Sequence, residues 1–275
     1  MHDATLKSKA LRFLRLHKGP AMLVLPNAWD VASARMFEAS GFNALGTTSA
    51  GIAYSLGYPD GQRIPREEML AAIRRIAAAV TIPVTADVEA GYGPWPEDVA
   101  NTVRAVLDAG AVGLNLEDAA NDLVMFDLAQ QVERVHAARE AASAAGVPLV
   151  INARTDVYLI HGEGEGRFDD ALRRLTAYRD AGATCLFLPG VRDPNLIARM
   201  VRALSAPLNV LAGPGTPRAG DLENMGVARL SLGSGPMRAA MGMLRQVARE
   251  LIEEGTYDLM FENAVPYQEM NELMR

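Results

Sequence analysis

Short apolar runs alternate with longer amphipathic segments along most of this chain. Eight runs are apolar at nearly every position, at residues 22–26, 44–48, 83–88, 112–116, 149–153, 184–188, 208–211 and 228–232. The segments between them carry apolar residues at helical spacing, at residues 29–40, 66–80, 97–109, 128–145, 168–181, 194–204 and 218–225. The alternation predicts eight β-strands separated by α-helices.

Glycine residues mark the ends of several predicted helices. A glycine readily takes the left-handed conformation that closes a helix, and it stands just before the next apolar run at Gly41, Gly110, Gly146, Gly182 and Gly226. Because strands that are apolar throughout are buried on both faces, the sheet is predicted to be parallel. Eight such units favour an α/β fold with a closed (β/α)8 TIM barrel, and a doubly wound open sheet is the alternative.

Both ends of the chain carry further helical patterns. Residues 1–19 place apolar side chains at helical spacing among basic ones, which predicts an N-terminal amphipathic helix; a mitochondrial presequence is the alternative. After the eighth run, helical patterns return at 236–254 and 268–274. We therefore expect one (β/α)8 barrel domain over residues 1–275, in which 236–275 form a helical C-terminal extension.

Composition narrows the class of protein. The chain has 275 residues, of which 49% are hydrophobic and 22% charged, so a folded core can form. With 27 Lys and Arg against 33 Asp and Glu, the net charge of −6 disfavours a nucleic-acid partner. The single cysteine, Cys185, offers neither an intrachain disulfide nor a Cys-based zinc site. No apolar run approaches the ~18 residues that span a membrane, so we expect a cytoplasmic enzyme.

Polar residues gather where the predicted strands end. In a barrel, the carboxyl ends of the strands form one mouth, and active sites lie there. The second to fifth runs lead into TTSAG (47–51), DVEAGYG (87–93), NLED (115–118) and NARTD (152–156). The candidate substrate-binding residues are Thr48, Ser49, Ala50, Arg154 and Asn209, and the candidate catalytic residues are Asp60 and Arg154.

Asp87 and Glu89 are the candidate centre of a metal site. Two residues apart on a strand, their side chains would point the same way, and two adjacent carboxylates repel each other unless a cation lies between them. Oxygen ligands without His or Cys favour Mg²⁺, or Mn²⁺, over zinc. Glu117 on the next strand could join directly or through a water. The alternative is that these are ordinary loop-end charges paired with basic residues.

The other candidates each have a structural alternative. Arg154 could clamp a carboxylate or phosphonate, or form an ion pair with Glu117 or Asp156. The turn at 48–50 could hold an oxyanion on its backbone N–H groups. Asp60 lies in a loop expected to fold over the mouth, as a general acid or base, a nucleophile, or a simple turn residue. Residues 233–235 occupy a common phosphate-binding position, which leaves a phosphate-bearing substrate as a further alternative.

Residues 85–93, TADVEAGYG, resemble the Asp-x-Asp/Glu-x-Gly-Tyr-Gly metal motif of the isocitrate lyase/phosphoenolpyruvate mutase superfamily. The chain is also similar to this family at residues 47–51, 56–60, 116–118 and 152–156, in the same order. Within this superfamily the chain looks like the 2-methylisocitrate lyases and phosphonomutases. The resemblance implies Mg²⁺-dependent making or breaking of a C–C or P–C bond next to a 2-oxo acid or its enolate.

The resemblance also implies roles for individual residues. Asp87 would be the main metal ligand, with Glu89 and Glu117 beside it or acting through water. Residues 48–50 would cradle the oxo acid, Arg154 would bind its second anionic group, and Asp60 would either attack phosphorus or support the metal's waters. The family further implies a homotetramer, or a dimer, in which a C-terminal helix packs on a neighbouring subunit.

The chain departs from the family in the loop after the fourth strand. Isocitrate and 2-methylisocitrate lyases carry a Lys-Lys-Cys-Gly-His motif there, whereas residues 118–127 read DAANDLVMFD. We expect a lyase-type enzyme acting on a small 2-oxo or 2-hydroxy di- or tricarboxylate such as isocitrate, methylisocitrate or oxaloacetate. The alternatives are a phosphonopyruvate mutase or hydrolase that acts on a P–C bond, and a 2-oxo acid binding protein that has lost its proton donor.

Overall fold

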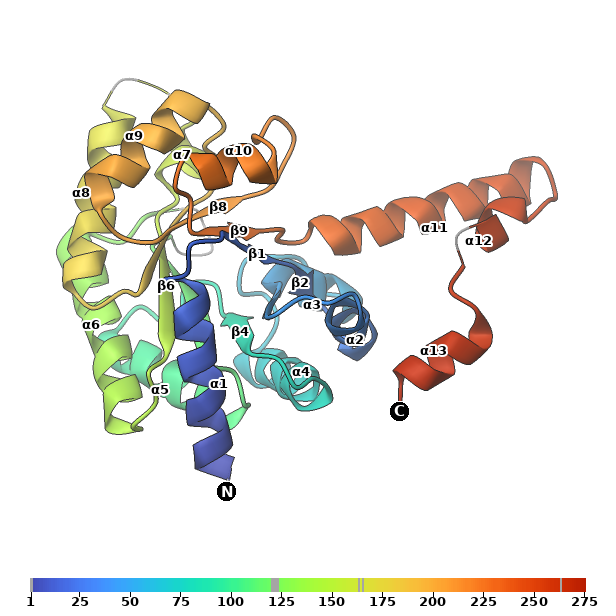
Figure 1. The fold of residues 1–275 in the computed structure, drawn as a ribbon, viewed down its shortest axis with the longest axis horizontal. Coiled ribbons are helices and arrows are strands. Elements are labelled where there is room, and N and C mark those ends of the chain that lie inside the picture. The colour runs from blue at the N-terminus through green and yellow to red at the C-terminus, as the bar shows by residue number, and fades with distance from the viewer. Residues whose placement is uncertain (1, 120–123, 163, 165, 263) are drawn as a thin grey trace.

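The eight apolar runs form a single parallel sheet. The computed structural model describes residues 2–119, 124–162, 164, 166–262 and 264–275 (Figure 1). In this part of the chain the strands are β1 (Leu23–Leu25), β2 (Asn27–Ala28), β3 (Leu45–Thr47), β4 (Val84–Asp87), β5 (Gly113–Glu117), β6 (Val150–Arg154), β7 (Cys185–Leu188), β8 (Leu208–Leu211) and β9 (Arg229–Ser231).

The sheet closes through its first strand, which is broken in two. Leu25 of β1 pairs with Ser231 of β9, and Ala28 of β2 pairs with Thr47 of β3. Pro26 lies at the break, where a missing N–H is tolerated. Because β1 lies in the first predicted run, residues 22–26, and β2 continues that strand at 27–28, the nine strand segments make an eight-stranded barrel. The (β/α)8 prediction is confirmed, and the open sheet is wrong.

The helices follow the predicted segments to within one or two residues, except that α1 ends three residues before the end of the N-terminal segment 1–19. Their bounds are α1 (His2–Leu16), α2 (Val31–Ala39), α3 (Ser49–Ser55), α4 (Arg66–Ala79), α5 (Pro96–Asp108), α6 (Leu128–Ala144), α7 (Val157–His161), α8 (Arg167–Asp180), α9 (Pro194–Leu204), α10 (Ala219–Asn224), α11 (Gly235–Glu253), α12 (Asp258–Glu262) and α13 (Tyr267–Leu273). Three short helices, α3, α7 and α12, were not predicted. The five glycines expected to end helices all have positive φ.

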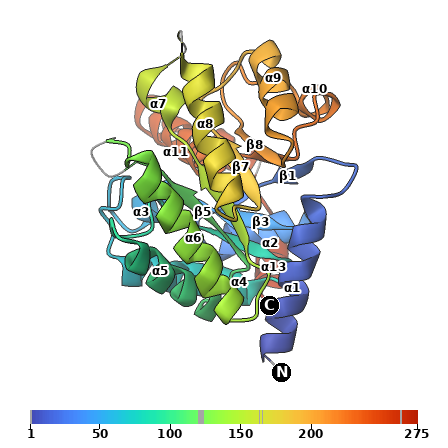
Figure 2. The same ribbon diagram turned by 90° about the vertical axis from the view of Figure 1, so that its left-hand side faces the viewer.

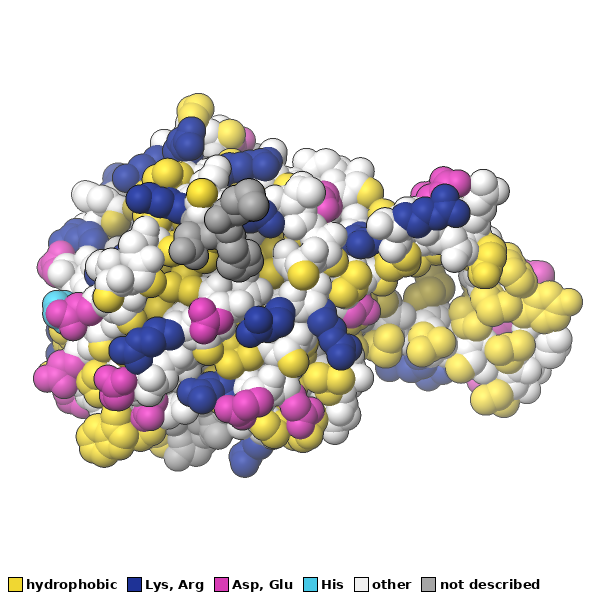
Figure 3. Space-filling model, turned by 90° about the horizontal axis from the view of Figure 1, so that it is seen from below, with side chains coloured by type: hydrophobic (Ala, Val, Ile, Leu, Met, Phe, Trp, Pro, Cys, Tyr) yellow, Lys and Arg dark blue, Asp and Glu magenta, His cyan; other side chains and the backbone are white. Residues whose placement is uncertain are grey.

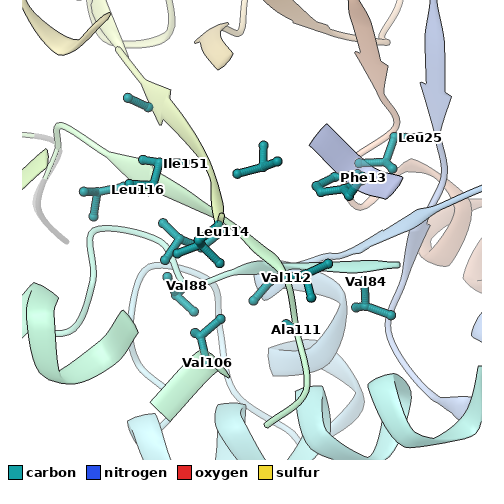
Figure 4. Packing of buried hydrophobic residues seen from close by; sticks show 14 of the residues in the cluster. Phe13, Leu25, Val84, Val88, Val106, Ala111, Val112, Leu114, Leu116 and Ile151 are labelled. Carbon is teal, nitrogen blue, oxygen red and sulfur yellow. The ribbon is translucent and has the colours of Figure 1, made fainter. Parts of the chain in front are cut away.

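Outer helices and an N-terminal plug enclose the barrel. Figure 2 shows α5, α6 and α8 side by side on its outside. Helix α1 lies at the end opposite the candidate mouth, where buried Phe13 reaches so close to Gly113 at the start of β5 that a side chain there would collide with its ring. Phe13 lies beside Leu25 in the core, and Val88 lies between Val106 of α5 and Leu114 of β5 (Figure 4).

The C-terminal helices form an arm that leaves the barrel. Helix α11 projects away from the body, and the chain then turns back through α12 and α13 (Figure 1). The arm returns to the body where Arg35 of α2 donates a hydrogen bond to the carbonyl of Leu273, at 2.9 Å. Hydrophobic side chains gather on the arm, across a hollow from the body (Figure 3). Among the described residues, no helix is both long and apolar enough to cross a membrane.

Candidate active site

A cavity of about 130 Å³ opens at the carboxyl ends of the strands. Five of the predicted site residues line it: Ser49, Asp60, Glu89, Glu117 and Arg154. The rest of the lining comes from Gly61, Gln62, Ala90, Ala119 and Asp156. The fold therefore brings together residues from four strand ends and from the loop between α3 and α4, as the barrel reading predicts.

Asp87, the last residue of β4, is held in place by its neighbours. Its Oδ2 accepts hydrogen bonds from the backbone N–H of Ser49 at 3.0 Å and from the Ser49 hydroxyl at 2.8 Å. Its own backbone N–H donates to the Thr47 hydroxyl at 2.8 Å, and the amide of Asn115 lies 3.4 Å from Oδ1. Three adjacent segments thus fix the orientation of this carboxylate.

Glu89 reaches the cavity by a route that the sequence analysis did not foresee. We expected Asp87 and Glu89 to share one strand face, but β4 ends at Asp87 and Glu89 takes a left-handed conformation, with φ of 52°. The bend turns its carboxylate into the cavity rim, where only 5% of the residue is exposed. One oxygen accepts the backbone N–H of Gln62 at 2.5 Å, and the other has no hydrogen-bond partner.

The carboxylates at the mouth repel one another. Burial and the charges of Asp87 and Asp60 raise the pKa of Glu89 to about 8. Burial and Asp87 also raise the pKa of Asp60. Burial raises the pKa of Glu117, whereas the positive charge of Arg154 acts to lower it. Four carboxylates line the cavity together with a single guanidinium, so an anionic ligand would meet net negative charge there.

Arg154 is fully engaged in ion pairs. Its Nη1 lies 2.5 Å from Glu117 Oε1, and its Nε lies 2.6 Å from Asp156 Oδ1. Glu117 and Asp156 were the two alternative ion-pair partners expected for Arg154, and Arg154 pairs with both. Arg154 also lines the cavity, so a ligand there would have to share it with these carboxylates.

A buried network behind Arg154 was missed in the sequence analysis. Asp118 is completely buried and accepts hydrogen bonds from the Thr155 hydroxyl, the Asp156 backbone N–H and the Tyr178 hydroxyl, at 2.7 to 2.9 Å. Arg174 pairs with the same carboxylate at 3.3 Å. The network fixes the chain at 155–156 and so the position of Arg154. Tyr178 and Arg174 come from α8, far from any motif, so no local signal could reveal them.

Four predicted site residues are not among those that line the cavity, namely Asp87, whose contacts are given above, and Thr48, Ala50 and Asn209. Thr48 and Ala50 belong to the start of α3 and not to an open turn, and the Thr48 hydroxyl accepts the Gly51 N–H at 3.3 Å as a helix cap. Asn209 is the second residue of β8, too early in the strand to reach its carboxyl end, and its amide donates to the Ser231 hydroxyl at 3.1 Å. Substrate binding by Thr48, Ala50 and Asn209 therefore stays a prediction.

The phosphate-loop alternative also loses support. The side-chain oxygen of Asn27 accepts the backbone N–H groups of both Leu232 and Gly233, each at 2.9 Å. The Gly233 amide of the 233–235 segment is therefore already used by the barrel. The loop that lacks the Cys motif includes residues 120–123, which lie outside the described residues.

The residues present fit a hydrated divalent cation. In the described part of the chain, no three His, Cys, Asp or Glu side chains converge tightly enough to chelate an ion by themselves. Mg²⁺ does not need this, because it commonly binds through one or two carboxylates and completes its shell with waters and substrate. The unpartnered, buried oxygen of Glu89 and the adjacent Asp87 are oxygen donors of the kind that Mg²⁺ takes.

Known proteins are similar to this chain in sequence and fold. The family model described as "Phosphoenolpyruvate phosphomutase" matches residues 13–252. A Burkholderia cenocepacia protein provisionally called a lyase/mutase is 40% identical with a TM-score of 0.92, over 98% of this chain and 96% of that one. The 2-methylisocitrate lyase of Escherichia coli is 28% identical over 90% of this chain and 85% of its own length.

Oxaloacetate acetylhydrolase is a further structural neighbour, with 27% identity and a TM-score of 0.85 over 98% of this chain and 94% of that one. Its likeness runs through the barrel and into the C-terminal helices, as the coverage shows. Lyases, a mutase and a hydrolase therefore share the architecture. The chain belongs to the isocitrate lyase/phosphoenolpyruvate mutase superfamily.

Proposed function

We propose that this protein is a Mg²⁺-dependent lyase-type enzyme that breaks or forms a C–C bond next to a 2-oxo acid or its enolate. One observation carries the proposal: four carboxylates and one already paired guanidinium line the cavity at the barrel mouth. Such a cavity repels an anionic substrate unless a cation is bound first. A cation and a 2-oxo acid together would balance the charge.

Some of the site residues would hold the cation, and others would bind the substrate. Asp87 would hold the ion, with Glu89 and Glu117 contacting it directly or through water. Bound Mg²⁺ would act as a Lewis acid toward the oxygens of the oxo acid. Ser49, whose N–H and hydroxyl both donate to Asp87, would orient that ligand, and Arg154 would bind the second carboxylate of the substrate.

The cavity favours a small substrate. At about 130 Å³, the cavity is well below the roughly 300–1,000 Å³ of pockets that enclose drug-sized ligands. A three- or four-carbon acid such as oxaloacetate suits this volume better than the tricarboxylates isocitrate and methylisocitrate. A structural neighbour that is an oxaloacetate acetylhydrolase agrees with this choice.

P–C bond chemistry is the second candidate function. Asp60 lines the same cavity as Glu89, in a position from which a carboxylate could attack a phosphorus atom. Phosphonopyruvate is also a three-carbon oxo acid, so the cavity volume does not separate the two chemistries. The bond that is cleaved will distinguish them.

The C-terminal arm supports a homo-oligomer. Along α11 the exposed side chains of Met241, Leu244 and Leu251 recur at helical spacing, and neighbouring Ile252 is 85% exposed. An apolar stripe of this kind on a projecting helix is typical of a protein interface. We propose that it packs on a second copy of this chain, in a dimer or tetramer.

An NMR assay tests the function. Protein with Mg²⁺ is incubated with oxaloacetate, isocitrate, methylisocitrate and phosphonopyruvate, and ¹H and ³¹P signals are followed. We expect one acid to react, with loss of turnover in excess chelator and in Asp87→Ala, but not in the exposed control Asp180→Ala. Turnover that survives both chelator and Asp87→Ala would contradict the metal-dependent mechanism, and binding without reaction would identify a 2-oxo acid binding protein.

A further inference from the structure

The loop at residues 56–65 is bonded across the cavity rim through one residue, Gln62. This loop joins α3 to α4 and carries Asp60. The backbone N–H of Gln62 donates to Glu89 at 2.5 Å, and its side-chain oxygen accepts the backbone N–H of Tyr92 at 2.7 Å. Gln62 therefore connects the loop to both ends of the turn at 89–92, which directly follows β4.

The contact is also where the backbone is most strained. Only four non-glycine residues in the described part of the chain have positive φ, and three of them are Gln62 at 54°, Glu89 at 52° and Tyr92 at 59°. Such a conformation is unfavourable for a residue other than glycine and persists only where surrounding contacts enforce it. The two hydrogen bonds of Gln62 join these three residues, so each helps to hold the others.

The position of Asp60 depends on this contact. Asp60 is two residues before Gln62, and Asp60, Gly61 and Gln62 all line the cavity. On its outer side the loop has a different attachment, because the hydroxyl of Tyr58 donates to the exposed Glu68 at 3.1 Å. The outer bond anchors the loop to α4 but does not touch the turn at 89–92.

We infer that Gln62 is a positioning residue, which holds the Asp60 loop against the 89–92 turn and so fixes Asp60 over the cavity. The inference rests on the proposed function in one respect, namely that Asp60 acts on the bound substrate. A misplacement of a reacting group by about 1 Å can lower the rate by about 100-fold. Gln62 would accordingly affect kcat without itself contacting the reacting atoms.

Two substitutions separate the side-chain bond from the backbone conformation. Gln62→Met keeps the length of the side chain but removes the acceptor for the Tyr92 N–H. Gln62→Asn keeps an amide, and asparagine tolerates positive φ well, but its side chain is one methylene too short to reach Tyr92. Tyr58→Phe is the matched control, since it removes one hydrogen bond from the outer side of the same loop.

Hydrogen exchange measures the contact independently of activity. In both Gln62 variants we expect amides at 89–93 and 58–64 to exchange about five- to tenfold faster, the effect of losing one hydrogen bond. In Tyr58→Phe we expect no change at 89–93. With the substrate found by NMR, we expect kcat to fall 10- to 100-fold at unchanged KM and unchanged Mn²⁺ affinity.

The outcomes test the positioning role of Gln62 separately from the proposed function. Unchanged exchange in Gln62→Met and Gln62→Asn would overturn the inference, as would faster exchange accompanied by unaltered kcat. If wild-type protein turns over none of the acids, the proposed function fails, while faster exchange would still support the contact. Wild-type exchange in Gln62→Asn alone would show that backbone conformation, and not the bond to Tyr92, holds the loop.

Discussion

Substituting Arg154 by methionine tests whether its ion pairs stabilise the mouth of the barrel. The guanidinium lies 2.5 Å from Glu117 and 2.6 Å from Asp156, and the exposed fractions of these three side chains are only 19%, 14% and 2%. Methionine can fill much of the same space, but it leaves two buried carboxylates without their cation.

The size of the effect follows from these contacts. Unit charges about 4 Å apart attract by about 4 kcal/mol at an effective dielectric constant near 20. Desolvation of the three groups offsets part of this attraction, yet removal of one partner from a buried pair typically costs about 3–5 kcal/mol. We expect Arg154→Met to lose that amount of unfolding free energy, which is a large fraction of the stability of an ordinary domain.

A double variant separates stability from catalysis. Urea unfolding followed by circular dichroism would give the free energies for wild type, Arg154→Met, and Arg154→Met with Glu117→Gln. Because Glu117→Gln removes one of the two unpaired charges, we expect the double variant to recover about half of the lost unfolding free energy. Turnover should be absent in the double variant as in Arg154→Met. A loss below about 1 kcal/mol in the single variant, or no recovery in the double variant, would refute the reasoning.

Two further predictions concern the plug and the arm. Burial and the charge of Arg229 lower the pKa of His17 from 6.5 to about 4, so as the pH falls through this range the unfolded chain takes up a proton that the folded chain does not. Between about pH 7.5 and 5.5, wild type should therefore lose about 1.3 kcal/mol more stability than His17→Gln in urea unfolding, at about 1.4 kcal/mol per pKa unit; equal losses would contradict this. Leu244→Glu with Ile252→Glu should reduce the particle mass in light scattering to that of one chain, whereas Gln246→Glu on the opposite side of α11 should not. An unchanged mass in the double variant would exclude this stripe as the interface.

The sequence was most informative where structure is local. Apolar runs and helix-ending glycines located the strands and main helices because burial and positive φ act on single segments. The broken first strand and the short helix α3 escaped because the period of a pattern is not readable over so few residues. Glu89 was assigned to the cavity for the wrong reason, since its strand ends at Asp87. The contacts of Asp118 with α8 join residues about 60 positions apart, which no motif reports.

The local conflicts at the mouth point to one cause. A folded chain rarely keeps a buried carboxylate oxygen without a partner, three left-handed non-glycine residues in one contact, and four carboxylates around one arginine. Here the first two occur in the turn at 89–92 and the loop that contacts it, and the third surrounds the same cavity. Deeper in the barrel, buried amides pair with one another, such as Asn152 with Asn115 at 2.8 Å, although Oδ1 of Asn152 and Nη1 of Arg229 are also buried without a partner. The crowded carboxylates and the left-handed residues nevertheless gather at the mouth, which is the pattern expected where a bound cation and substrate complete the site.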